Sequence, residues 1–436
     1  MKTMEITWLH YYDIIYKVAS LTGMWPFLKS RIKIFRVTLL TLITLTVLVP
    51  QIAYQLRCHK SDISCICESM TSYLLSVVIL VKIYTFQLNI RAIRSFTQRL
   101  FLDWEELKNP EEYEIMKSYA TNSRRFSLIY SVYCLSASPI FMSMSLVPFV
   151  LDITSPLNES RPTLPPYPGY YFVNIREYFF QILWHAIIAW EILIAGIVAH
   201  DCMFVMYVEH ICSKFAVVGF RFEHLFYKDK EMEIFKINSY DIYRKKIAFI
   251  VHKHREALKF AQLLENIFTI PFAIQMLIAT IGISITLLQV TQQNSDVVKS
   301  IRYVLYIVGQ LIHLFFLSFE GQKLIDHSMQ MRDRIYNSCW YEASMRSQKL
   351  LVLIMLKSLQ PTFLSAGPAN FNVILYGSRV LSVAHVVPTS GLSNISNLSS
   401  TSLNLMIQIV CLKYLVAYEA LLNVKLSLLI IVLTFL

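Results

Sequence analysis

Long apolar runs recur along almost the whole chain, and they restrict its fold more than any other feature of the sequence. Each run has about 18 or more residues with few charges, which is the length that a helix needs to cross a bilayer. The composition agrees, since 55% of the 436 residues are hydrophobic, 16% are charged and the mean hydropathy is +0.49. The runs are continuous rather than alternating, which argues against a β-barrel. We therefore predict an all-α, multi-pass membrane protein.

Seven of these runs qualify as spanning helices. Their approximate bounds are 35–55, 70–90, 126–151, 177–207, 264–290, 301–319 and 363–387. Pro139 and Pro148 are expected to kink the third span, and Pro361 is expected to end a helix ahead of the seventh. Because Lys82 lies in the middle of the second span, we expect a partner or a wet cavity beside it.

Basic residues divide unequally between the two sets of loops. Thirty Lys and Arg fall on the side of the N-terminus, and six fall on the opposite side. The more positive side of a membrane protein faces the cytoplasm. The segment 1–34 is therefore predicted to be cytoplasmic, and the seven-helix domain 35–387 is predicted to end outside. Asn158, in an Asn-x-Ser glycosylation pattern, and the cysteine-rich loop 56–68 then also lie outside.

The sequence contains no motif that indicates catalysis or a cofactor. No Ser/His/Asp order, P-loop or HExxH motif occurs, and the eight cysteines lack a paired metal-binding spacing. We therefore predict neither an enzyme nor a metal site. Two of Cys58, Cys65 and Cys67 could pair outside the cell, but three free thiols fit the sequence equally well. The net charge is +11, and the Lys and Arg residues lie in the segments between apolar runs. This position favours a role in membrane topology over nucleic-acid binding.

Titratable residues also occur inside the fourth span. His185 and Glu191 are not spaced to share one helical face, so a joint site is not expected. His200 and Asp201 are interpreted as capping or interfacial residues near the cytoplasmic end of this span.

The seventh span carries more polar groups than a lipid-facing helix would. Asn370, Asn372, Tyr376 and Ser382 occur within it, together with one fixed charge, Arg379. Such a helix usually faces protein or water. We therefore expect it to face a pore or the centre of the bundle.

Short patterns along the chain resemble the insect odorant receptor family. Val208–Cys212, followed by Arg221–Leu225, is similar to the family's segment at the cytoplasmic end of the fourth helix. Asn337–Tyr341 resembles its short aromatic element, and Gln348–Gly367 resembles its last conserved region. The order of these patterns over residues 10–378 is more specific than any single one. The chain lacks the long insertion of the family's shared co-receptor, so it resembles a ligand-tuned subunit.

The resemblance implies a ligand-gated, non-selective cation channel in the plasma membrane of sensory neuron dendrites. Four subunits, including the co-receptor, would surround one pore, with Val373, Tyr376 and Gly377 of the seventh helix lining it. A related gustatory-type receptor of the same inverted topology is the alternative. A membrane transporter is a more distant one, because no repeat relates residues 35–207 to 264–387. An inside N-terminus and the lack of DRY-like and NPxxY-like motifs argue against a G-protein-coupled receptor.

The resemblance also implies a site for a small volatile ligand in the outer half of the bundle, among spans two, three, four and six. Tyr303, Tyr306 and Gln310 share one helical face there, as do Gln181 and Trp184. For each residue, ordinary helix packing is the competing interpretation. The full set of predicted ligand-binding positions is Tyr73, Val77, Met142, Ser145, Gln181, Trp184, His185, Tyr303, Tyr306 and Gln310.

The resemblance fades after Ser378. Residues 388–402 form a Ser/Asn-rich linker, and an apolar stretch follows at 403–436. This divergent tail, 388–436, has three interpretations: an eighth span, an outer interfacial segment, or translated intron or misassigned exon. We favour the third because the resemblance is lost abruptly.

Overall fold

The computed structural model describes residues 2–58, 63–107, 109–156, 161–225, 239–292 and 297–359. Every regular element within these residues is a helix, which confirms the predicted all-α fold. Several predictions lie outside the described residues, namely those for Asn158, the seventh span 363–387 with Val373, Tyr376 and Gly377, and the tail 388–436.

Six helices in the described part of the chain are long and apolar enough to cross a membrane. They overlap the first six predicted spans. They are α2 (Ser30–Arg57), α3 (Ile63–Leu88), α5 (Pro110–Ser143) with its continuation, α7 (Phe179–Glu223), α8 (Ser239–Gln292) and α9 (Val297–Tyr336). Shorter helices accompany them: α1 (Lys2–Leu21), α4 (Ile90–Glu106), α6 (Val147–Thr154), α10 (Met345–Lys357) and the 3₁₀ turns η1 (Met144–Leu146) and η3 (Trp340–Glu342).

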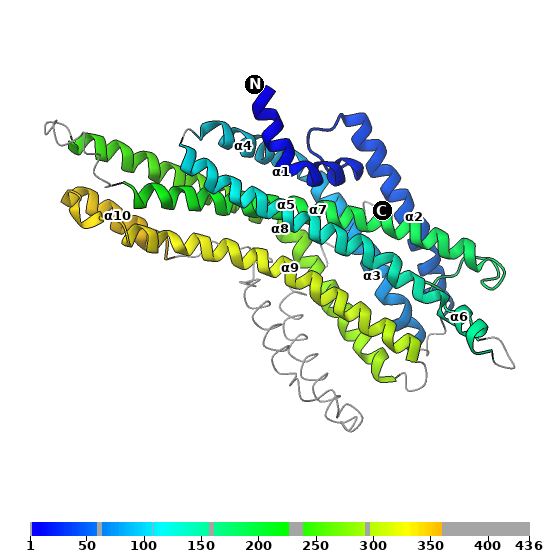
Figure 1. Cartoon of the computed structure of the whole chain (residues 1–436). Helices are drawn as coiled ribbons and strands as arrows, with labels where there is room; N and C mark the ends of the chain where they lie inside the picture. The colour runs from blue at the N-terminus through cyan, green and yellow to red at the C-terminus, as the bar shows by residue number, and fades with distance from the viewer. Residues whose placement is uncertain are drawn as a thin grey trace.

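The long helices extend well beyond the apolar runs that predicted them. Helix α7 has 45 residues, about 68 Å, whereas the hydrocarbon core of a bilayer is about 30 Å thick. Residues 208–223 lie in the loop between the fourth and fifth predicted spans, yet they continue α7 without a break. Figure 1 shows α5, α7, α8 and α9 running side by side, with α6 at one end of the bundle and α10 at the other.

The two prolines of the third span behave differently. Pro139 lies inside the continuous helix α5. Pro148 occupies the first turn of α6, directly after the break at η1. A first-turn proline needs no amide hydrogen, so the helix restarts there without losing a hydrogen bond. The expected kink therefore occurs between the two prolines, close to Pro148.

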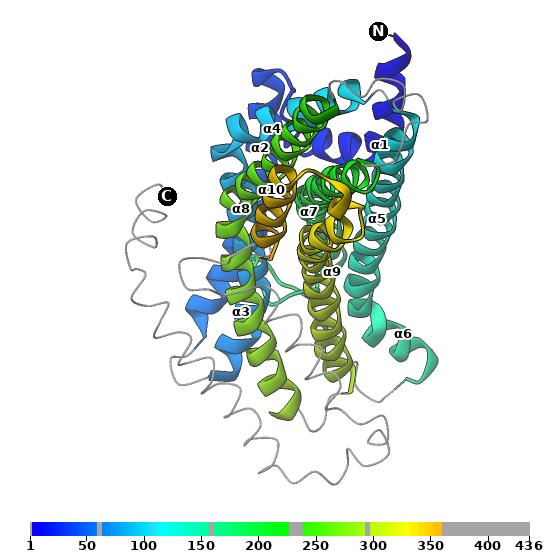
Figure 2. The same ribbon diagram turned by 90° about the vertical axis from the view of Figure 1, so that its left-hand side faces the viewer.

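Helix α7 is the central element of the bundle. It packs against α1, α2, α3, α5, α8 and α9, and Figure 2 shows it enclosed between α5, α8 and α9. Every residue from 196 to 219 is buried. A helix that is buried on all sides must be apolar or must pair its polar groups internally.

Polar groups of α7 are paired in this way with Asp103 of helix α4. The Asp103 carboxylate lies 2.9 Å from Nε2 of His210 and accepts a hydrogen bond from Nζ of Lys214 at 2.7 Å. Burial by itself would raise the pKa of Asp103. The hydrogen bond to His210 and the charge of Lys214 outweigh burial and hold this pKa well below its usual range.

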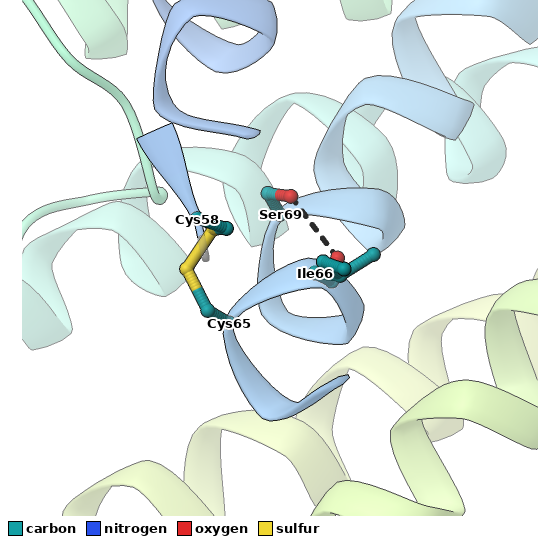
Figure 3. Close-up of a disulfide and its surroundings, with 4 residues drawn as sticks. All are labelled: Cys58, Cys65, Ile66 and Ser69. Atoms are coloured by element: carbon teal, nitrogen blue, oxygen red, sulfur yellow. Dashed lines mark hydrogen bonds between the residues drawn. A yellow bond between two sulfur atoms is a disulfide. The ribbon is translucent and has the colours of Figure 1, made fainter. Parts of the chain in front are cut away.

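The C-terminal end of α2 and the first turn of α3 are joined by a disulfide. Cys58 and Cys65 are bonded, with 5.8 Å between their Cα atoms (Figure 3). Cys67 keeps a free thiol. In the next turn of α3 the Ser69 hydroxyl donates to the carbonyl oxygen of Ile66 at 3.0 Å. The structure thus selects one pairing from the alternatives that the sequence leaves open.

We expect Cys58→Ser to lower the free energy of unfolding by about 2 kcal/mol, because the bond closes a short loop in the unfolded chain. Thermal unfolding of the detergent-purified protein would measure the change, with Cys67→Ser as the control that leaves stability unaltered. Peptide mapping without reductant should recover Cys58 linked to Cys65. A linkage through Cys67 would contradict the structure.

Candidate ligand-binding site

The predicted face of α9 meets two other helices, α3 and α8. Tyr303, Tyr306 and Gln310 are half-buried there. The Tyr306 hydroxyl donates a hydrogen bond of 3.4 Å to the carbonyl oxygen of Thr71 on α3. A Cβ placed on Gly282 of α8 would lie 3.3 Å from the same hydroxyl. Tyr306 therefore lies where α3, α8 and α9 meet, and α8 was absent from the predicted set of helices.

The predicted positions on α3 and on the third span are buried or half-buried. Tyr73 and Val77 follow Thr71, the contact of Tyr306, by two and six residues along α3. Met142 and Ser145 are buried. No hydrogen-bond partner reaches the Ser145 hydroxyl from the described residues. These four positions remain available to an internal site.

The predicted positions on α7 do not join this group. Trp184 is 61% exposed and Gln181 is also exposed, because the inward face of α7 at this level consists of Leu183 and Ala186. Gln181 and Trp184 do share a helical face, but that face points away from the bundle. His185 instead lies against the neighbouring loop and α2, where Nδ1 is 3.4 Å from the Tyr171 hydroxyl and Nε2 is 3.1 Å from Oγ1 of Thr46.

A buried ion pair lies deeper in the bundle. Nζ of Lys82 on α3 donates to Oδ1 of Asp201 on α7 at 2.6 Å, and both side chains are 1% exposed. Nδ1 of His200 lies 3.0 Å from the same carboxylate oxygen. The expected partner of Lys82 is therefore confirmed. The capping or interfacial interpretation of His200 and Asp201 was wrong, because both residues are buried on a helix that continues well past them.

The ion pair extends into a polar network across five helices. The Tyr130 hydroxyl of α5 donates to Oδ2 of Asp201 at 2.9 Å and lies 2.7 Å from Nδ1 of His313 on α9. The side-chain amide of Gln275 on α8 contacts Nε2 of His313. His313 follows Gln310 by three residues, so it continues the Tyr306 and Gln310 face one turn further into the bundle. That spacing is visible in the sequence and could have identified His313.

The side chains gathered here suit the binding of a small molecule. Within the described ranges no group of three or more His, Cys, Asp or Glu side chains could hold a metal ion. Asp201 is neutralised by Lys82 and receives further hydrogen bonds, so it is a stable structural charge. Above it, aromatic and amide side chains lie on an otherwise apolar helix face, which is the composition of small-molecule sites.

The fold and this internal polar arrangement define a multi-pass helical membrane protein of the receptor type. The profile of the 7tm Odorant receptor family matches residues 62–378, which is most of the chain. The protein belongs to the odorant receptor family.

Individual relatives agree with this assignment. The chain is similar to Odorant receptor 22c of Drosophila melanogaster, with 21% identity over 310 residues that cover 69% of this chain and 75% of the relative. Odorant receptor 67c of the same species is 25% identical over 194 residues, covering 42% and 44%. The insect olfactory receptor OR5 from Machilis hrabei, solved in complex with eugenol, has a TM-score of 0.64 at 16% identity, over 87% of this chain and 96% of that one. This last likeness shows a shared fold.

We expect Lys82→Met to destabilise the protein by about 3 to 5 kcal/mol, because it leaves the Asp201 charge buried without its counter-ion. The double variant Lys82→Met, Asp201→Asn should regain much of that loss. Thermal unfolding in detergent would measure both. Lys117→Met, which breaks the solvent-exposed pair with Glu114, is the matched control and should leave stability nearly unchanged. A Lys82→Met protein as stable as wild type would contradict a structural role for the buried pair.

Proposed function

We propose that this odorant receptor is a ligand-tuned subunit that forms a non-selective cation channel with the family's shared co-receptor. The observation that supports this most directly is the fold, because 96% of a solved insect olfactory receptor superposes on the chain. That receptor was solved with eugenol, a small organic molecule with an apolar body and one hydroxyl. A ligand of the same general kind suits the outer half of this bundle.

The proposed ligand site centres on Tyr306. Its hydroxyl contacts α3 and lies close to α8, so a ligand beside it would contact residues of three helices. Apolar contact would supply most of the affinity, at about 25 cal/mol per Å² buried, which limits a small volatile molecule to modest affinity. Tyr73, Val77, Met142, Ser145, Tyr303 and Gln310 remain in the proposed site, whereas Gln181, Trp184 and His185 do not.

The remaining parts of the proposal concern membrane placement and the pore. The charge distribution supports a cytoplasmic N-terminus in the plasma membrane. The polar content of the seventh span supports Val373, Tyr376 and Gly377 as pore-lining residues. The tail 388–436 begins beyond the end of the family match at residue 378, which is compatible with a segment foreign to the receptor.

Recording odorant-evoked current from cells that express the chain with and without the co-receptor would test the proposal. We expect cation current only when both subunits are present. Current that persists without any co-receptor would contradict the tuning-subunit role. Uptake of a solute without current would instead favour a transporter.

We expect Tyr306→Ala to raise the half-maximal ligand concentration about 10- to 100-fold, because truncation removes an aromatic contact that contributes about 1.5 to 3 kcal/mol. Dose–response currents with the co-receptor present would measure this shift. Trp184→Ala is the matched control, since it truncates an aromatic ring on the exposed face of α7. Equal shifts for the two variants would argue against an internal site at Tyr306.

A further inference from the structure

The hydrogen bonds of the buried network have a fixed direction. Tyr130 has a single hydrogen to donate, and it donates it to the negatively charged Asp201 at 2.9 Å. The Tyr130 oxygen is therefore the acceptor in its 2.7 Å contact with His313. It follows that Nδ1 of His313 carries the hydrogen of that contact.

The other nitrogen of His313 is then an acceptor. Lys82 already balances Asp201, so a protonated imidazole would add an uncompensated positive charge to the buried network. In the neutral ring, Nε2 presents a lone pair, and it lies 3.6 Å from Oδ2 of Asp201, beyond hydrogen-bond distance. Its partner is the side-chain nitrogen of Gln275, which donates to it. This chain of donors determines which end of the Gln275 amide faces His313.

The amide oxygen of Gln275 is left without a donor. No group in the described part of the chain donates to Oε1, although the Gln275 side chain is only 4% exposed. Leaving a buried acceptor unpaired is costly, so native structures rarely retain one without a partner of some kind. This oxygen is therefore an unpaired acceptor at the end of the network. Donor and acceptor are assigned in the contacts that link Lys82, Asp201, Tyr130, His313 and the Gln275 nitrogen.

The free acceptor lies at the inner end of the proposed ligand site. Gln275 and Gly282 are seven residues apart on one face of α8, and Tyr306 and His313 are seven residues apart on one face of α9. Gly282 lies opposite Tyr306, and Gln275 lies opposite His313. The two contacts are therefore about 10 Å apart along the helices. A Cβ on Gly282 would lie only 3.3 Å from the Tyr306 hydroxyl, so the missing side chain is what lets this hydroxyl approach α8.

We propose that Gln275 is a specificity-determining residue whose amide oxygen accepts a hydrogen bond from a hydroxyl or N–H group of the odorant. The receptor then favours alcohols and phenols over ethers that have the same carbon skeleton but no hydrogen to donate. Lys82, Asp201, Tyr130 and His313 act as positioning residues, because they orient the amide. The inference rests on the proposed function, since it names the ligand chemistry of the same site.

The test uses the full chain expressed with the co-receptor and a panel of matched pairs, each an aliphatic alcohol or a phenol and its O-methyl ether. For every pair that evokes current, we expect the hydroxyl compound to act at a concentration about five- to tenfold lower. Gln275→Met has a similar shape and no acceptor oxygen, so it should make the two members of a pair equally effective. Gln322→Met, at an exposed position of α9 beyond the bundle's polar network, is the matched control and should keep the preference.

The outcomes separate the inference from the proposed function. Wild-type receptor that responds equally to both members of the pairs, or better to the ethers, would overturn the inference and leave the odorant-gated channel standing. This comparison needs no variant, so it holds even if Gln275→Met fails to reach the membrane. A preference for the hydroxyl compound that survives Gln275→Met would also overturn the inference. The Gln275 oxygen would then accept its hydrogen bond from a bound water and not from the odorant. Silence towards the whole panel with the co-receptor present would count against the proposed function itself.

Discussion

The ion pair between Lys82 and Asp201 is the constraint on which the arrangement of the bundle depends. Asp201 lies on α7 within residues 196–219, all of which are buried, so water cannot solvate its charge. An unpaired carboxylate in that position would cost several kcal/mol, and α3 supplies the counter-charge. Tyr130 and His313 then connect α5 and α9 to the same carboxylate. The network around this one charge thereby links α3, α5 and α9 to α7.

The need to pair buried charges also explains how α7 continues beyond its apolar run. Outside the apolar runs, α7 still carries Glu209, Lys214 and Arg221, and each meets an opposite charge on a neighbouring helix. Lys214 pairs with Asp103 of α4, and Arg221 pairs with Glu112 of α5 through two hydrogen bonds. Because these side chains are paired across helices, long polar segments remain helical where they were expected to be linkers.

The apolar pattern was sufficient to predict the helices but not their rotation. The first six spans follow directly from runs of hydrophobic residues, since a spanning helix needs little else. Trp184 shows the limit of this reasoning. Its face of α7 is as apolar as the opposite face, so periodicity cannot distinguish the side that meets lipid from the side that meets the bundle. The structure leaves Trp184 and Gln181 exposed and Tyr306 half-buried, a difference that the apolar pattern does not contain.

By itself, the sequence determined the all-helical membrane fold, the approximate spans, the bias of basic residues and the need of Lys82 for a partner. These properties depend on composition along the chain, which the bilayer selects without reference to neighbouring helices. Only the tertiary structure decided that the partner is Asp201 and that Cys58 pairs with Cys65. It also decided that α8 brings Gln275 against His313 at one end of the network. The contacts of Asp201 and Gln275 join residues far apart along the chain, and they arise only when helices pack in a particular register. The disulfide joins residues seven apart, and the positions of α2 and α3 decide which cysteines meet.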